Sequence, residues 1–170
     1  MALLADVIND ILGVGTTTNT GLYYYVNHSL TATAGVTAEH ALTINSKLED
    51  SPLNRIDDET LQLPAVFFDT VGAFPTTMTR GKHYDCTFSI RVYYLDKATV
   101  GVVPKQSART AICKLTDNVM ASDKLGLDWI DSLEWRGFDD DNDVTRFLGI
   151  ILQDYIAAST RFEVRAGVTF

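Results

Sequence analysis

The chain has 170 residues, of which 46% are hydrophobic and 21% are charged, and its formal net charge at pH 7 is −8. This length and composition are typical of one globular domain, which buries about 70% of the surface that its unfolded chain exposes. The acidic balance argues against a protein that grips nucleic acid by its phosphates, because such binding needs clustered lysines and arginines.

The N-terminal quarter predicts a helix, a loop and a short strand. Residues 2–12 carry apolar side chains three and four positions apart, which predicts an amphipathic helix that ends at Gly13. A polar loop is expected over 15–21. The three successive tyrosines within 22–26 favour a short strand, since aromatic residues are enriched in strands. The N-terminus lacks the basic residues of a signal peptide, and no apolar run approaches the roughly 20 residues that span a membrane.

The next segment predicts a second helix and a charged loop. Thr37 is placed to cap a helix over 38–48, and Pro52 then interrupts the chain. Residues 54–62 follow as a loop with three successive acidic side chains. We expect these to lie on a solvated surface, as charge runs usually do. The acidic residues are Asp57, Asp58 and Glu59.

Alternating side chains predict two long, half-buried strands. From 84 to 95 the even positions are apolar or aromatic, and the odd positions up to Arg91 are polar. Residues 155–165 alternate in the same way, with Thr160 as the one polar residue on the apolar side. Side chains alternate between the two faces of a strand, so each of these segments places one apolar row on a core.

A helix over 104–122 is predicted between the two strands. Pro104 suits its first turn, and apolar residues recur along one side. We expect this helix and the strands to share one core, which contains Phe88, Ile90, Val92, Ile112, Leu115, Phe162 and Val164. Shorter strands are predicted over 63–69, 132–138 and 144–152, the last being either separate from the 155–165 strand or continuous with it.

This order of elements predicts an α+β fold in two layers, with a mostly antiparallel sheet backed by helices. We expect a single domain over 1–170, with a core at 63–170 and an N-terminal extension at 1–50. Long strands on a small sheet also leave open edges, and pairing with a neighbouring subunit is one way to cover them.

Residues 71–83 are expected to form a long, polar hairpin arm that leads into the 84–95 strand. The segment is rich in threonine and contains Gly72, Pro75 and Gly81. Arms of this kind are common at binding surfaces. The residues that we predict to contact other subunits or partners are Phe74, Thr76, Thr77, Met78, Arg80 and Lys82.

The acidic run at 139–143 is the strongest metal-like signal in the chain. Its carboxylates alternate as in an EF-hand loop, but Val144 and Ile150 stand where that loop needs glycine and glutamate. A solvated acidic turn is therefore expected instead of a calcium site. The acidic side chains of this turn are Asp139, Asp140, Asp141 and Asp143.

No motif for catalysis or for a cofactor is found in the sequence. The histidines His28, His40 and His83 lie in unrelated segments, and the glycines lack the context of a phosphate-binding loop. We expect no catalytic residue, no bound metal and no cofactor, and hence no enzyme. The two cysteines and the two tryptophans are assigned to packing or to an interface. Cys86 and Cys113 are expected to be buried thiols, and Trp129 and Trp135 to be core or interface anchors.

The segments after residue 62 occur in a recognisable order: Leu63–Phe68, the polar arm, the 84–95 strand, the 104–122 helix and the closing 155–165 strand. This pattern covers about two-thirds of the chain and resembles the tail terminator proteins of long-tailed bacteriophages. The resemblance implies an α+β subunit that forms a homohexameric ring without catalytic activity. Such a ring caps the finished tail tube, stops its polymerisation and joins the tail to the head–neck connector.

The same resemblance implies the partners and the location. The ring would contact the tail tube protein, the neck or connector protein and, in a contractile tail, the last sheath layer. DNA would pass through the bore without specific binding, and the protein would reside in the tail or neck of the virion after assembly in the host cytoplasm. The acidic segments at 57–59 and 139–143 would help to prevent further growth of the tail tube on one ring face, since like charges across a contact are unfavourable.

Two other functions stay open at the level of sequence. The first is another virion protein, namely a tail tube, neck or head-completion protein. The second is a small enzyme or ligand-binding α+β domain, which needs a cleft with convergent titratable groups.

Overall fold

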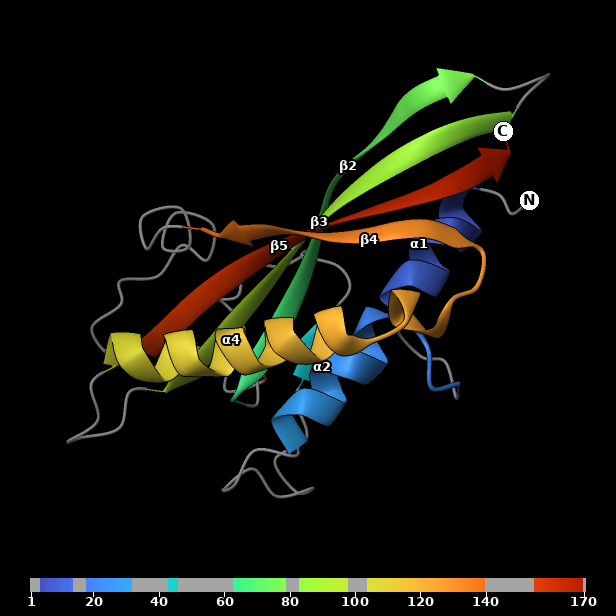
Figure 1. Cartoon of the computed structure of the whole chain (residues 1–170). Helices are drawn as coiled ribbons and strands as arrows, with labels where there is room; N and C mark the ends of the chain where they lie inside the picture. Colours follow the sequence, from blue (N-terminus) through green and yellow to red (C-terminus); the bar gives the residue numbers. More distant parts are fainter. Residues whose placement is uncertain are drawn as a thin grey trace.

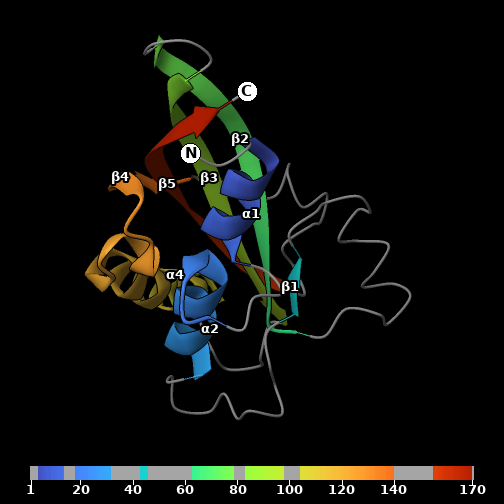
Figure 2. The same cartoon turned by 90° about the vertical axis from the view of Figure 1, so that its right-hand side faces the viewer.

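A computed structural model describes residues 4–13, 18–31, 43–45, 63–78, 83–97, 104–139 and 155–169. Within these ranges the protein has an α+β fold with a mostly antiparallel sheet backed by helices, as predicted (Figure 1). Figure 2 shows helices α2 and α4 on one side of the central strands. The elements in chain order are α1 (Leu4–Leu12), α2 (Gly21–Thr31), β1 (Thr43–Asn45), β2 (Ala65–Met78), β3 (His83–Lys97), α4 (Pro104–Ala121), the 3-10 turn η2 (Lys124–Gly126), β4 (Ile130–Phe138) and β5 (Tyr155–Thr169).

The sheet has the strand order β1-β2-β3-β5-β4. Strands β2, β3, β5 and β4 are each antiparallel to the next, whereas the short β1 pairs in parallel with the start of β2. At the centre, β3 and β5 are paired along their full lengths, from His83↔Thr169 to Lys97↔Tyr155. The two strands that the alternating pattern predicted therefore form the middle of the sheet.

The hydrophobic core lies between the sheet and the helices. The apolar rows of β3 and β5 meet the apolar side of α4, where Ala108, Ile112, Leu115 and Val119 are all buried. This confirms the predicted core, whose seven members all belong to one buried cluster. The N-terminal helices contribute to the same cluster through Val7, Ile11, Leu12, Leu22 and Val26.

Polar side chains are hydrogen-bonded to one another within the core where α4, β5 and β4 meet. Thr160, the polar exception on the apolar side of its strand, is fully buried. Its hydroxyl lies 3.1 Å from the hydroxyl of Thr116 and accepts a hydrogen bond of 3.0 Å from the indole Nε1 of Trp135. Because a buried hydroxyl without a partner is costly, these bonds make a polar residue tolerable at this position.

Several predicted elements are confirmed with small changes in their bounds. These are the helices over 2–12 and 104–122 and the strands over 84–95, 132–138 and 155–165. The predicted strand over 144–152 lies outside the described residues.

Two N-terminal predictions are wrong. The tyrosine segment over 22–26 is part of the helix α2, in which Leu22 and Val26 are buried one turn apart. Packing of these two residues against the core outweighs the strand preference of the tyrosines between them, because that preference depends strongly on context. In the predicted helix over 38–48, residues Thr43–Asn45 form the strand β1, and the rest of the segment lies outside the described residues.

The corner between α1 and α2 depends on two glycines with positive φ, Gly13 (+68°) and Gly21 (+84°). A Cβ atom on Gly21 would lie 2.7 Å from Cα of Gly13 and 2.9 Å from the carbonyl oxygen of Asp10. The two backbones therefore approach more closely than any side chain allows. Glycine at these two positions therefore allows the ends of α1 and α2 to approach each other at this corner.

Gly21→Ala is expected to destabilise the protein. The left-handed conformation alone costs about 1–2 kcal/mol for a residue with Cβ, and the backbone contact adds to that cost. The matched control is Gly137→Ala, where φ is also positive (+106°) but no atom lies within 4 Å of the added Cβ. Chemical denaturation should show the larger loss at Gly21. An equal or smaller loss there would contradict the close contact.

Candidate functional site

The sheet face opposite the helices carries a band of charged and hydroxyl side chains. It arises from the polar rows of the central strands, which the sequence alternation already separates from the apolar rows. In the strand register, Asp69 is the neighbour of Arg91, and Arg91 is the neighbour of Arg161. Two residues further along β5, Glu163 is the neighbour of Glu134 on β4. Charges of both signs therefore lie side by side across four strands.

Asp139, which directly follows β4, contacts side chains of this band on β3 and β5. Its carboxylate lies 2.5 Å from Nη2 of Arg161 and 3.7 Å from Nε of Arg91, and it accepts a hydrogen bond of 2.7 Å from the Ser159 hydroxyl. Its side chain is only 5% exposed. The backbone N–H of Asp139 also donates to the carbonyl oxygen of Ser159, so both the main chain and the side chain fix the end of β4.

Two carboxylates, from Glu134 and Glu163, neutralise Arg136. Its guanidinium lies 2.6 Å from Glu163 and 2.8 Å from Glu134, and the hydrogen bond with Glu163 raises the pKa of Arg136. Burial raises the pKa of Asp69, and the nearby Arg91 partly offsets this rise. Arg91, Arg136 and Arg161 of the polar face are thus paired with carboxylates, whereas the exposed Arg165 in the same row forms no ion pair with the described residues.

The prediction of a solvated acidic turn is wrong for Asp139. The structure buries its carboxylate against arginines of β5 and β3, because the register brings Arg161 and Arg91 beside it. The other predicted acidic surface residues lie outside the described residues. They are Asp57, Asp58, Glu59, Asp140, Asp141 and Asp143.

The predicted arm is largely strand. Residues 71–78 of the predicted hairpin arm continue β2 and pair with β3 as far as Met78↔Tyr84, so this part of the arm belongs to the sheet. The register shifts on either side of Val71 and Thr76 mark bulges, and Pro75 lies beside one of them. Proline is tolerated in strands at edges and bulges. Phe74, Thr76, Thr77 and Met78 thus lie on β2, whereas Arg80 and Lys82 fall outside the described residues.

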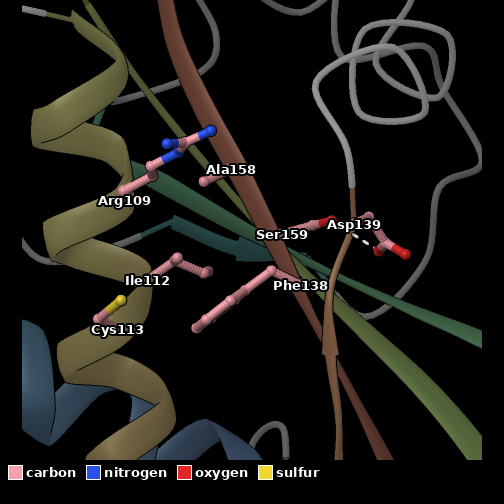
Figure 3. Close-up of a pocket in the computed structure, with 7 residues that line it drawn as sticks. All are labelled: Arg109, Ile112, Cys113, Phe138, Asp139, Ala158 and Ser159. Atoms are coloured by element: carbon pink, nitrogen blue, oxygen red, sulfur yellow. Dashed lines mark hydrogen bonds between the residues drawn. The ribbon is translucent and has the colours of Figure 1, made fainter.

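A pocket of about 390 Å³ lies between α4 and the ends of β4 and β5 (Figure 3). Figure 3 shows the Phe138 side chain directed toward Ile112 and Cys113 on the helix, while the Asp139 carboxylate points away from α4. The residues that line the pocket are Arg109, Ile112, Cys113, Phe138, Asp139, Ala158 and Ser159.

Exposed aromatic rings lie beside this pocket. Trp135 and Phe138 are 44% and 47% exposed, and their ring centroids are 5.0 Å apart in an edge-to-face arrangement. Trp129 is exposed as well. The expectation that the tryptophans anchor the core is therefore wrong, and their expected role as interface anchors stays a prediction.

The two cysteines differ in their surroundings. Cys86 is buried, as predicted, and burial raises the pKa of its thiol. Cys113 is exposed and lines the pocket, so the prediction of a buried thiol is wrong for it. It directly follows the buried Ile112 on α4, where a step of one residue already turns the side chain away from the core.

Other candidate chemistry is sparse in the described part of the chain. The His83 ring Nδ1 forms a hydrogen bond of 2.9 Å with the Thr169 hydroxyl. Over the described ranges, no group of three or more histidine, cysteine, aspartate or glutamate side chains is placed to hold a metal ion. None of the helices in these ranges is long and apolar enough to cross a membrane.

A scan against models of protein families and a search of curated proteins each found no match.

Proposed function

We propose that the protein is a ring-forming tail terminator of a long-tailed bacteriophage. In this role it caps the tail tube, stops polymerisation of the tube and joins the tail to the head–neck connector. It acts as a structural protein and not as an enzyme. Its partners are other copies of itself, the tail tube protein, the connector protein and, in a contractile tail, the sheath.

The observation that supports this proposal best is that the sheet has two open edges, which are formed by different strands. At one edge lies β4, which among the described strands pairs only with β5. At the other, β1 covers only Ala65–Phe67 of β2, so the rest of that strand pairs with β3 alone in the described residues. Open edges of long strands are templates for pairing with another chain.

The directions of these edge strands suit a closed ring. Successive strands from β2 to β4 alternate in direction, so β2 and β4 run oppositely. Rotation about an axis along the strands would bring β4 of one copy beside β2 of the next as an antiparallel pair. A contact between two different surfaces of identical copies generates a ring when the rotation closes.

The charged face suits a bore through which DNA passes. In the proposed ring the helices cover the outer side of the sheet, and the polar face is turned to the inside. Three of its arginines, Arg91, Arg136 and Arg161, are paired with carboxylates, which leaves Arg165 as the arginine of this face without an ion pair among the described residues. DNA can then slide past, whereas a cluster of unpaired lysines and arginines would retain it.

The ring predicts the particle mass in solution. Six chains of 18.8 kDa give a particle of about 110 kDa, which sedimentation equilibrium or mass photometry can measure. A protein that stays monomeric at all accessible concentrations would contradict the ring and favour a ligand-binding domain. A ring of this mass would also fit a tail tube or neck protein, and these alternatives are separated by the phenotype of particles that lack the protein.

A further inference from the structure

The pocket between α4 and β4 combines an apolar interior with one available positive charge. Ile112 and Phe138 face each other across it (Figure 3), and Arg109 lies at its α4 wall. Arg109 is exposed, and no carboxylate of the described residues forms an ion pair with it. The carboxylate of Asp139 is already engaged by Arg161 and Ser159. Among the described residues that line the pocket, Arg109 is therefore the one positive charge, and no described carboxylate neutralises it.

The rim of the pocket has the composition of a protein-binding surface. Trp135 and Phe138 together expose two large rings next to Arg109's pocket. Aromatic and arginine side chains are enriched among the residues that carry most of the binding energy at protein interfaces. The pocket volume of about 390 Å³ is at the low end of the range for ligand sites, and it offers room for a single large side chain with its flanking main chain.

We infer that this pocket docks an extended segment of a partner protein, in which an aromatic or aliphatic side chain stands next to an aspartate or glutamate. The apolar side chain enters between Ile112 and Phe138, and the carboxylate pairs with Arg109. Nucleic acid fits this site poorly, because it requires clustered cations and the described lining supplies one. The pocket opens on the helix side of the sheet, beside the edge strand β4.

The pocket contains its own reporter group. The thiol of Cys113 lines the pocket and is exposed, whereas Cys86 is 1% exposed. A thiol reagent such as Ellman's reagent therefore labels the native protein at Cys113 and spares Cys86. A segment bound in the pocket is expected to slow this labelling.

The test is a selection of displayed random dodecamer peptides on the full chain. Enriched peptides are expected to pair phenylalanine, leucine or isoleucine with a neighbouring acidic residue, and to slow the labelling of Cys113. Their synthetic versions should bind Arg109→Glu and Phe138→Ala at least about tenfold more weakly. The matched control is Lys114→Glu, the same charge change on an exposed α4 residue that does not line the pocket, and it should alter binding less than about twofold.

Several outcomes would overturn the inference. They are a selection that enriches no peptide, enrichment of basic peptides, binding that Arg109→Glu leaves intact, or bound peptides that do not protect Cys113. Peptides that match a segment of this chain would make a second copy the occupant, and would equally overturn the assignment to a partner protein. Circular dichroism of each variant establishes that a loss of binding is not a loss of folding.

Discussion

Replacement of Leu115 by alanine is expected to lower the free energy of unfolding by about 2–5 kcal/mol. Leu115 is fully buried on α4, in the cluster that joins this helix to β3 and β5. Truncation removes buried apolar surface and leaves a cavity that the neighbouring side chains fill only in part. Urea denaturation with a linear extrapolation measures this loss directly.

The adjacent residue provides the control for this prediction. Lys114 is exposed, and Lys114→Ala should change the free energy of unfolding by less than about 0.5 kcal/mol. If Leu115→Ala loses no more than this, then α4 does not pack on the sheet by the side that carries Leu115.

Replacement of Asp139 by alanine is expected to lower the free energy of unfolding by about 2–3 kcal/mol. The change removes the acceptor of the Arg161 and Ser159 hydrogen bonds and the ion-pair partner of Arg91, and leaves partly buried guanidinium groups without this carboxylate. Loss of one partner from a fully buried ion pair costs about 3–5 kcal/mol. The expected value is smaller because the side chains of Arg161 and Arg91 are 34% and 26% exposed.

Two variants serve as comparisons for Asp139→Ala. Asp139→Asn keeps an oxygen for the Ser159 hydroxyl and should recover part of the loss. Glu134→Ala removes a carboxylate from the exposed Arg136 pair, and exposed ion pairs contribute little to stability, so its loss should be smaller. Urea denaturation measures the free energy of unfolding of the three variants. An equal loss for Asp139→Ala and Glu134→Ala would show that the end of β4 is not held by the Asp139 carboxylate.

The elements with strong periodicity are the ones that the sequence predicted well. The 84–95 and 155–165 segments alternate over many residues, and α4 repeats its apolar residues every three or four positions, so packing and local preference agree. The tyrosines of α2 were misread, since burial of Leu22 and Val26 decides there and the strand preference does not. The length of β2 was underestimated because Gly72 and Pro75 resemble turn residues, yet bulges accommodate both within a strand.

The candidate site was less accessible to sequence reasoning. The burial of Asp139 follows from a register that places Arg161 beside it, and no local pattern encodes a register between strands far apart in the chain. The same holds for the pocket, which exists because β4 pairs with β5 and thereby brings Phe138 opposite α4. The signal in the sequence is Trp135-Arg136-Gly137-Phe138, where two aromatic residues flank a charge and a glycine in a predicted strand.

The most direct test of the proposed function is electron microscopy of phage particles made without this protein. A tube subunit recreates at each ring the surface that it bound, so a tube grows without limit unless another protein caps it. We expect full heads and separate tails that fail to join, with tails of variable length, and addition of the purified protein should restore joining. Tails of normal length joined to full heads in the absence of the protein would contradict the assignment as a tail terminator.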